Sequence, residues 1–183
     1  YVPQREGADW ALPVAVIGLG LAVVEKPGAD VLVETYAGNV ALRNEDGQLV
    51  PALPRKSRFA VEKWLQSNGE TVTPADAAKR PGWTCRDNRC DAVVRGKRLT
   101  YATGESADSL DCRDIDILVA SFPLRRNCRD VPVRIDRFDV WRSGAHTIRI
   151  EGDKVGVDTA RAGQGERPWT VVPQARKDVF KPR

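Results

Sequence analysis

The stretch Val133–Ile150 holds the residue types in this chain that could do chemistry. It combines arginines and two aspartates with Trp141 and with His146, the only histidine of the 183 residues. A single histidine excludes mechanisms that need two, and the sequence contains neither a glycine-rich phosphate loop nor a Gly-x-Ser-x-Gly nucleophile elbow. We therefore assign no catalytic residue and interpret His146 as structural.

Carboxylates offer the one enzymatic alternative. Asp111, Asp114 and Asp116 could hold a divalent cation for a metal-dependent nuclease. At strand or turn spacing, however, such carboxylates are more often solvated or paired with neighbouring arginines. The sequence therefore predicts no metal, no cofactor and no enzymatic activity.

Basic residues gather in the C-terminal third, although the net charge is only +4, and six arginines and three aspartates lie between Arg125 and Arg142. Arginines that alternate with aromatic side chains can hold the backbone of a single-stranded nucleic acid while its bases stack on the rings. The alternative is that the aspartates pair with the arginines on a solvated face. The candidate contacts for single-stranded DNA are Arg125, Arg126, Arg129, Arg134, Arg137, Trp141 and Arg142.

Four cysteines form two candidate disulfides if the chain lies outside the cytosol. Cys85 and Cys90 flank a short polar loop between two expected strands, so a bridge there would close a tight hairpin. Cys112 and Cys128 bracket an expected buried strand, and a second bridge would close that loop. Free buried thiols and a zinc site are the alternatives, although the spacing differs from that of usual zinc sites.

The stretch Trp10–Val24 is a run of 15 residues without a charge. As a helix it would span about 22 Å, which is shorter than the roughly 30 Å hydrocarbon core of a bilayer. Trp10 at one edge suits a membrane interface. The residues leave three interpretations open, which are a membrane helix, a buried core helix and the apolar part of a signal peptide.

Short β-type runs and few helices predict a mixed α/β or α+β domain over residues 30–160. An irregular basic tail is expected over 161–183. The expected strands are 30–34, 40–43, 49–50, 83–85, 92–95, 99–102, 115–121, 131–135 and 147–150.

Two helices are expected within this domain. The first spans 57–68, with Ser57 as its N-terminal cap, Gly69 as its stop and Phe59 on its buried side. The second begins at Thr73, which is followed by a proline at the first helical position. The sequence Asp-Arg-Phe-Asp at 136–139 is interpreted as a turn.

Several segments, taken in order, resemble one family over about residues 10–170. The most specific are RFAVEKWL and IDRFDVWRSGAH, and the paired-cysteine segment WTCRDNRC and the strand segment DCRDIDILVAS lie between them. The chain resembles the C-terminal end of ComEC-type competence proteins, in the form typical of alphaproteobacteria.

The resemblance implies an inner-membrane protein that forms the channel for single-stranded DNA during natural transformation. Trp10–Val24 would be the end of its transmembrane region, and residues 30–160 would be an extracytoplasmic soluble domain. The implied partners are single-stranded DNA, the membrane and the rest of the channel protein, with a homo-oligomer as a further option.

In many relatives this domain is a metallo-β-lactamase-like module with a metal site of the His-x-His-x-Asp-His kind. This chain departs from that pattern, because the residues after the expected buried strand read Ala120-Ser121-Phe122-Pro123. The resemblance therefore implies a shortened derivative of that fold without its metal site, acting as a non-catalytic domain of a DNA-uptake channel. A purely structural module of the channel is the remaining alternative.

Overall fold

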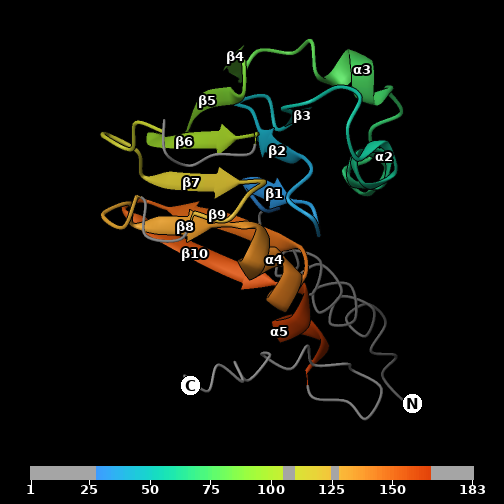
Figure 1. Cartoon of the computed structure of the whole chain (residues 1–183). Helices are drawn as coiled ribbons and strands as arrows, with labels where there is room; N and C mark the ends of the chain where they lie inside the picture. Colours follow the sequence, from blue (N-terminus) through green and yellow to red (C-terminus); the bar gives the residue numbers. More distant parts are fainter. Residues whose placement is uncertain (1–27, 105–109, 125–127, 166–183) are drawn as a thin grey trace, which may run out of the picture.

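Two five-stranded sheets pack face to face in the computed structural model, which describes residues 28–104, 110–124 and 128–165 (Figure 1). The fold is α+β, with ten short strands and four short helices among these residues. The strands are β1 (Val31–Val33), β2 (Val40–Arg43), β3 (Leu49–Pro51), β4 (Thr84–Arg86), β5 (Arg89–Val94), β6 (Lys97–Ala102), β7 (Ile117–Ala120), β8 (Val133–Ile135), β9 (His146–Glu151) and β10 (Lys154–Thr159). The helices are α2 (Arg58–Ser67), α3 (Pro74–Ala77), α4 (Arg137–Ser143) and α5 (Ala160–Gln164).

The first sheet, in the order β10-β9-β1-β2-β3, is antiparallel throughout. Its central strand, β1, pairs on one side with its neighbour in sequence and on the other with a strand near the end of the described chain. Val31 lies opposite Leu42 in β2 and opposite Ile148 in β9. The N-terminal and C-terminal parts of the domain therefore form one sheet.

The second sheet, in the order β4-β5-β6-β7-β8, is mixed. Strands β4, β5 and β6 form an antiparallel meander, and β7 and β8 then add in parallel. The predicted bridge between Cys85 and Cys90 is present and joins two residues that face each other in β4 and β5.

The core between the sheets consists of alternate residues of the strands, as expected for strands with one face buried. Val31, Val33 and Ile148 of the first sheet and Leu99 and Ile117 of the second are almost fully buried in one cluster. Burial of these branched side chains is the main favourable term that holds the sheets together.

A few buried polar contacts fix how the two sheets meet. The hydroxyl of Tyr101 in β6, which is fully buried, donates a hydrogen bond to the carbonyl oxygen of Ala37 in the β1–β2 turn at 2.8 Å. Asp30, 5% exposed at the start of β1, accepts hydrogen bonds from Arg95 in the β5–β6 turn and from the main-chain N–H of Ile150 in β9. One carboxylate therefore links the start of β1 to β9 in its own sheet and to the β5–β6 turn of the second sheet.

The outer face of the first sheet is covered by α2 and α3, on the right-hand side of Figure 1. Val61 and Leu65 of α2 and Ala77 of α3 pack with Leu49 of β3 in a second cluster. These helices begin and end largely as predicted. Thr73 caps α3, because its side chain accepts a hydrogen bond from the N–H of Asp76.

Two details of α2 were predicted wrongly. Ser57 precedes the helix in a left-handed conformation and makes no side-chain cap. Phe59 is 73% exposed rather than buried, because the helix contacts the sheet only through the side on which Val61 and Leu65 lie. Gly69 has the positive φ of 76° that its predicted role as the stop requires.

The outer face of the second sheet is covered by loops instead of helices. Leu118 and Ala120 of β7 pack there against Ile115, Phe122 and Leu124 in a third cluster. The predicted bridge between Cys112 and Cys128 is present and joins the loops before and after β7 over this cluster. The disulfide therefore holds in place the cover that a helix layer would otherwise supply.

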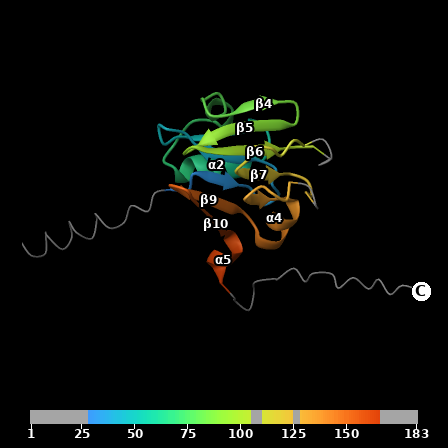
Figure 2. The same cartoon turned by 90° about the vertical axis from the view of Figure 1, so that its left-hand side faces the viewer.

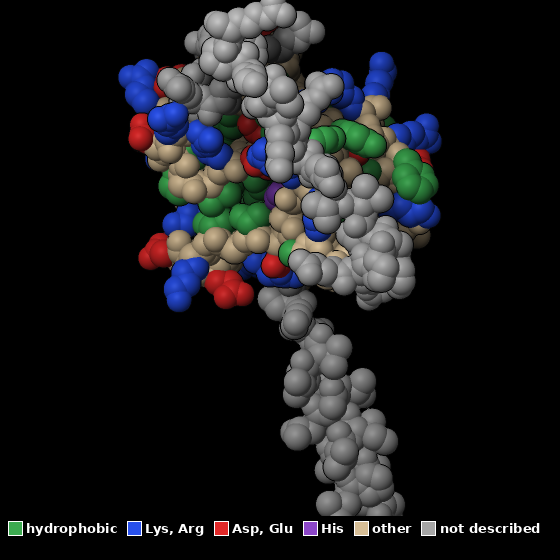
Figure 3. All heavy atoms as spheres, turned by 60° about the horizontal axis from the view of Figure 1, so that its bottom comes forward, with side chains coloured by type: hydrophobic (Ala, Val, Ile, Leu, Met, Phe, Trp, Pro, Cys, Tyr) green, Lys and Arg blue, Asp and Glu red, His purple; other side chains and the backbone are tan. Residues whose placement is uncertain are grey.

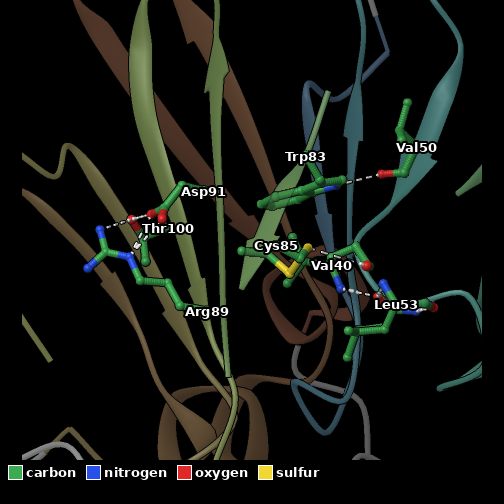
Figure 4. The surroundings of a disulfide bond; sticks show 11 residues. Val40, Val50, Leu53, Trp83, Cys85, Arg89, Asp91 and Thr100 are labelled. Carbon is green, nitrogen blue, oxygen red and sulfur yellow. Dashed lines mark hydrogen bonds and ion pairs between the residues drawn. A yellow bond between two sulfur atoms is a disulfide. The ribbon is translucent and has the colours of Figure 1, made fainter. Parts of the chain in front are cut away.

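The free edge of β3 is closed by side chains from the segment that leads to β4. Leu49 donates its N–H to Glu70 and accepts a hydrogen bond from Arg80, and Trp83 Nε1 donates to the carbonyl oxygen of Val50 at 2.9 Å. Figure 4 shows Trp83 and Cys85 lying toward this edge. The outer edge of β3 therefore presents few free main-chain groups.

The C-terminal region is more ordered than predicted. The expected turn at 136–139 begins helix α4, β10 was not predicted at all, and α5 occupies the first residues of the expected irregular tail. Helix α5 follows β10 and packs against α4 below the first sheet (Figure 2). Residues 166–183 of the tail and the predicted transmembrane stretch Trp10–Val24 lie outside the described residues.

Asn39 gives a test of the loop packing. Its buried amide donates to the carbonyl oxygens of Leu53 and Lys56 and accepts from the N–H groups of Val40 and Leu53. Asn39→Ala should lower the free energy of unfolding by about 2–4 kcal/mol, because these buried groups would lose their partners. Urea denaturation measures the change. Asn88→Ala, at an exposed turn, is the matched control, and an equal loss in both variants would contradict the role of Asn39.

The disulfides give a second test. Removing Cys112–Cys128 with paired serines should lower the free energy of unfolding by about 3 kcal/mol, because a long loop is released over the third cluster. Removing Cys85–Cys90 should cost less, since that bridge closes a hairpin already defined by its strand pairing. Thermal or urea unfolding of the two double-serine variants measures the two losses. A larger loss on removal of Cys85–Cys90 than on removal of Cys112–Cys128 would contradict this account.

Candidate nucleic-acid interface

Helix α4 begins at a reciprocal cap that the sequence spacing Asp136-x-x-Asp139 could have revealed. The carboxylate of Asp136 accepts hydrogen bonds from the N–H groups of Phe138 at 2.8 Å and Asp139 at 3.2 Å, and Asp139 accepts from the N–H of Asp136 at 3.0 Å. Such a capping box satisfies main-chain donors that the first turn of a helix leaves free. It converts the predicted turn into a helix.

The same cap anchors α4 to the second sheet. The other carboxylate oxygen of Asp136, which is 8% exposed, accepts a hydrogen bond from the N–H of Leu124 at 3.0 Å. Leu124 is fully buried in the loop that follows β7. Position and orientation of α4 are therefore fixed at its first turn.

Two aromatic side chains of α4 lie on the surface. Phe138 is 48% and Trp141 is 55% exposed, whereas Val140 is buried and packs in the core. Phe138 and Trp141 are three residues apart, so they are neighbours on one side of the helix. Neighbouring exposed rings offer apolar surface on which the bases of a single strand could stack. Exposure alone does not distinguish them, because Tyr36 and Phe59 are more exposed.

Two predicted arginines accompany these rings. Arg137 and Arg142 are both exposed, and Arg142 forms an ion pair with Asp139 at 2.9 Å. Arg137 is next to Phe138 in sequence and four residues before Trp141, so both charges lie within reach of the rings. The structure thus brings together Arg137, Trp141 and Arg142 of the predicted set and adds Phe138.

Of the other predicted arginines, the structure describes Arg129 and Arg134. Arg129 is exposed before β8, and α4 follows β8, so the two lie at opposite ends of that strand. Arg134 is half-buried within β8 and has an interaction partner. Arg125 and Arg126 lie outside the described residues.

His146 lies at the start of β9, 5% exposed, opposite Val33 of β1. Its Nδ1 is 2.8 Å from the carbonyl oxygen of Gly144. Burial lowers the pKa of the imidazole below its usual value, and this effect outweighs the Gly144 hydrogen bond and the charge of Asp139, which both raise it. The ring is largely covered and one of its nitrogens lies beside a main-chain oxygen, which fits the structural role that we predict for His146.

The aspartates that were the alternative candidates for a cation site interact with arginines. Asp111 binds Arg113, Asp114 binds Arg98 at 3.3 Å, and Asp116 accepts the main-chain N–H of Arg98 at 2.7 Å. The hydrogen bonds from Arg113 lower the pKa of Asp111 to about 2. No group of three or more metal-ligating side chains occurs within 28–104, 110–124 and 128–165.

Comparisons with known proteins identify no relative of this chain. No family model, no curated protein and no solved structure matches the chain. Among the residues that the structure describes, no helix has the length and apolar character needed to cross a bilayer. The basis for function is therefore the chemistry of α4 and the resemblance of the sequence segments.

The lowered pKa of His146 predicts a pH dependence of stability. The folded protein binds this proton less readily than the unfolded chain, so the stabilisation is complete above the ordinary histidine pKa and is lost as the pH falls below it. Urea denaturation at pH 7.5 and pH 5.5 should show a smaller decrease on acidification for His146→Gln than for the natural chain. An identical decrease in both would refute this assignment.

Proposed function

We propose that this chain is the C-terminal, non-catalytic domain of an inner-membrane DNA-uptake channel, and that α4 contacts the single strand during natural transformation. The observation that carries the proposal is the pair of exposed rings, Phe138 and Trp141, flanked by Arg137 and Arg142. Stacking of bases on rings beside cations is the usual way to bind single strands without sequence preference.

A second support is the sequence resemblance to ComEC-type competence proteins, which includes α4 itself in the segment IDRFDVWRSGAH. Both disulfides fit an oxidising compartment, so we place the domain on the extracytoplasmic side of the membrane. The stretch Trp10–Val24 would connect it to the membrane and to the rest of the channel.

The proposal includes the loss of an ancestral metal site. Where ligands would follow a buried strand, β7 is followed by Phe122, 5% exposed, and by the fully buried Leu124. On the resemblance, these apolar side chains would stand where a metallo-β-lactamase-like relative carries histidines. The relation to that fold stays a prediction, since no solved structure matches.

A structural module of the channel is the second candidate, favoured by the ion pair of Arg142 with Asp139. An arginine that is already paired gives up part of its attraction for phosphate. The two candidates differ in whether the purified chain binds single strands.

Binding of a fluorescently labelled oligothymidylate at low salt tests the proposal. The natural chain should bind, and the logarithm of its affinity should fall linearly with that of the salt concentration. Trp141→Ala should weaken binding by about 5- to 150-fold, the range for one stacked base. Arg137→Ala should reduce the magnitude of the salt slope by about 0.7.

Phe59→Ala is the matched control, because Phe59 is an even more exposed ring, on α2, far from α4 in the sequence. It should leave the affinity unchanged. No binding of single strands at low salt would favour the structural module. An equal loss in both ring variants would contradict a contact through α4.

A further inference from the structure

Strand β10 is an open edge of the first sheet. It pairs with β9 on one side, and no strand pairs with its other side in the part of the chain that the structure describes. Most of its residues are exposed, and Val157 keeps 40% of its surface in solvent. An unprotected edge of six residues is a template for pairing with another strand.

The pairing of β10 with β9 shows which main-chain groups of β10 point away from β9. Lys154 pairs with Glu151 across the two-residue turn, and Ala160 donates its N–H to Ala145 in the same register. Lys154, Gly156 and Asp158 therefore bond to β9. The N–H and C=O groups of Val155 and Val157, which alternate with them, point to the open edge.

One antiparallel register with a second copy satisfies these groups. With Gly156 of both copies on a two-fold axis, Val155 of each copy lies opposite Val157 of the other. Each of these pairs exchanges two main-chain hydrogen bonds. The lack of a side chain at Gly156 allows the two backbones to approach closely at the axis.

Charges favour the same register. Lys154 then lies opposite Asp158 of the second copy, on each side of the axis. Lys154 is exposed and forms no ion pair with a described residue, whereas Asp158 already binds Arg149. Shifting the register by two residues in either direction separates these opposite charges and leaves one facing valine pair, Val155 with Val155 or Val157 with Val157, in place of two. Cross-strand pairs of opposite charge stabilise a sheet, and like charges oppose pairing.

Val157 is the large apolar side chain that this edge exposes to solvent. Figure 3 shows the bottom of Figure 1, where hydrophobic side chains lie among basic and acidic ones. Pairing of β10 would cover Val157 with Val155 of the second copy. The pairing ends at Thr159, because α5 begins at Ala160.

We propose that two copies of this chain associate through β10, antiparallel and centred on Gly156, so that the two first sheets form one continuous ten-stranded sheet. The interface is isologous and closes after two copies. This inference is independent of the DNA-contact function, because it uses neither α4 nor its arginines.

Cross-linking of Gly156→Cys in the full 183-residue chain tests the register. Facing residues of a pair that shares no hydrogen bonds have Cα atoms about 4.5 Å apart, which suits a disulfide. A Cβ at Gly156 meets only the carbonyl oxygen of Arg149, at an ordinary 3.9 Å, so the variant should fold. Mild oxidation should give a covalent dimer, and its peptide map should show the introduced thiols of the two copies linked to each other.

Lys154→Cys is the matched control. Its thiols lie far from each other in this register, so the variant alone should give at least tenfold less dimer. A mixture of Lys154→Cys with Asp158→Cys should cross-link, because these positions face each other. Equal cross-linking of Lys154→Cys and Gly156→Cys would overturn the register, and no cross-linking of Gly156→Cys would overturn the dimer.

Light scattering during gel filtration gives a second readout without new cysteines. The natural chain, of 20.2 kDa, should show a concentration-dependent shift toward twice the monomer mass. Lys154→Glu should raise the concentration needed for this shift at least tenfold, and mixing it with Asp158→Lys should restore pairing. A monomer at every concentration would overturn the proposal.

Discussion

The carboxylate of Asp30 is the point through which the two halves of this domain are held together. It receives the N–H of Ile150 and the guanidinium of Arg95, while the main chain of Asp30 bonds to Ile148 and Arg43. The start of β1, the middle of β9, the end of β2 and the β5–β6 turn therefore meet at one residue. A buried charge is tolerated here because each oxygen has a donor and one donor is itself charged. Two further hydrogen bonds hold the second sheet and the segment before it against the first sheet. Tyr101 donates to the carbonyl oxygen of Ala37, and Trp83 donates to that of Val50.

Strands and helices were predicted correctly where neighbouring residues alone determine them. The runs at 40–43 and 117–120 are strongly apolar and form buried strands, and Thr73 followed by proline does begin a helix. Both disulfide pairs were also predicted, because each joins cysteines that bracket one element. Strand β10 was missed because an exposed edge strand needs few apolar residues, and its sequence holds a glycine and two charges. The pairing of β1 with β9 has no local signal, since it depends on the packing of the whole domain.

The candidate site depends on residues 136–139, which were predicted to form a turn but begin helix α4. One alternative was that the aspartates pair with the arginines. Asp139 does pair with Arg142, but Asp136 and the other oxygen of Asp139 cap α4. This cap turns Phe138 and Trp141 outward, because Val140 takes the single buried position of the short helix. Among the described residues, this helix carries two exposed arginines, Arg137 and Arg142. His146 and the aspartates at 111–116 have partners within the domain.

The pairing of Val31 with Ile148 constrains the order in which the domain can be made. A chain that emerges from its N-terminus presents β1, β2 and β3 long before β9 exists, so the centre of the first sheet stays open on one side. The second sheet is built from the continuous segment 84–135, contains both disulfides and can assemble without waiting for the end of the chain. Both disulfides lie within this segment, so neither pairing needs a residue of β9 or β10. The first sheet, in contrast, is complete only when β9 and β10 have been added beside β1.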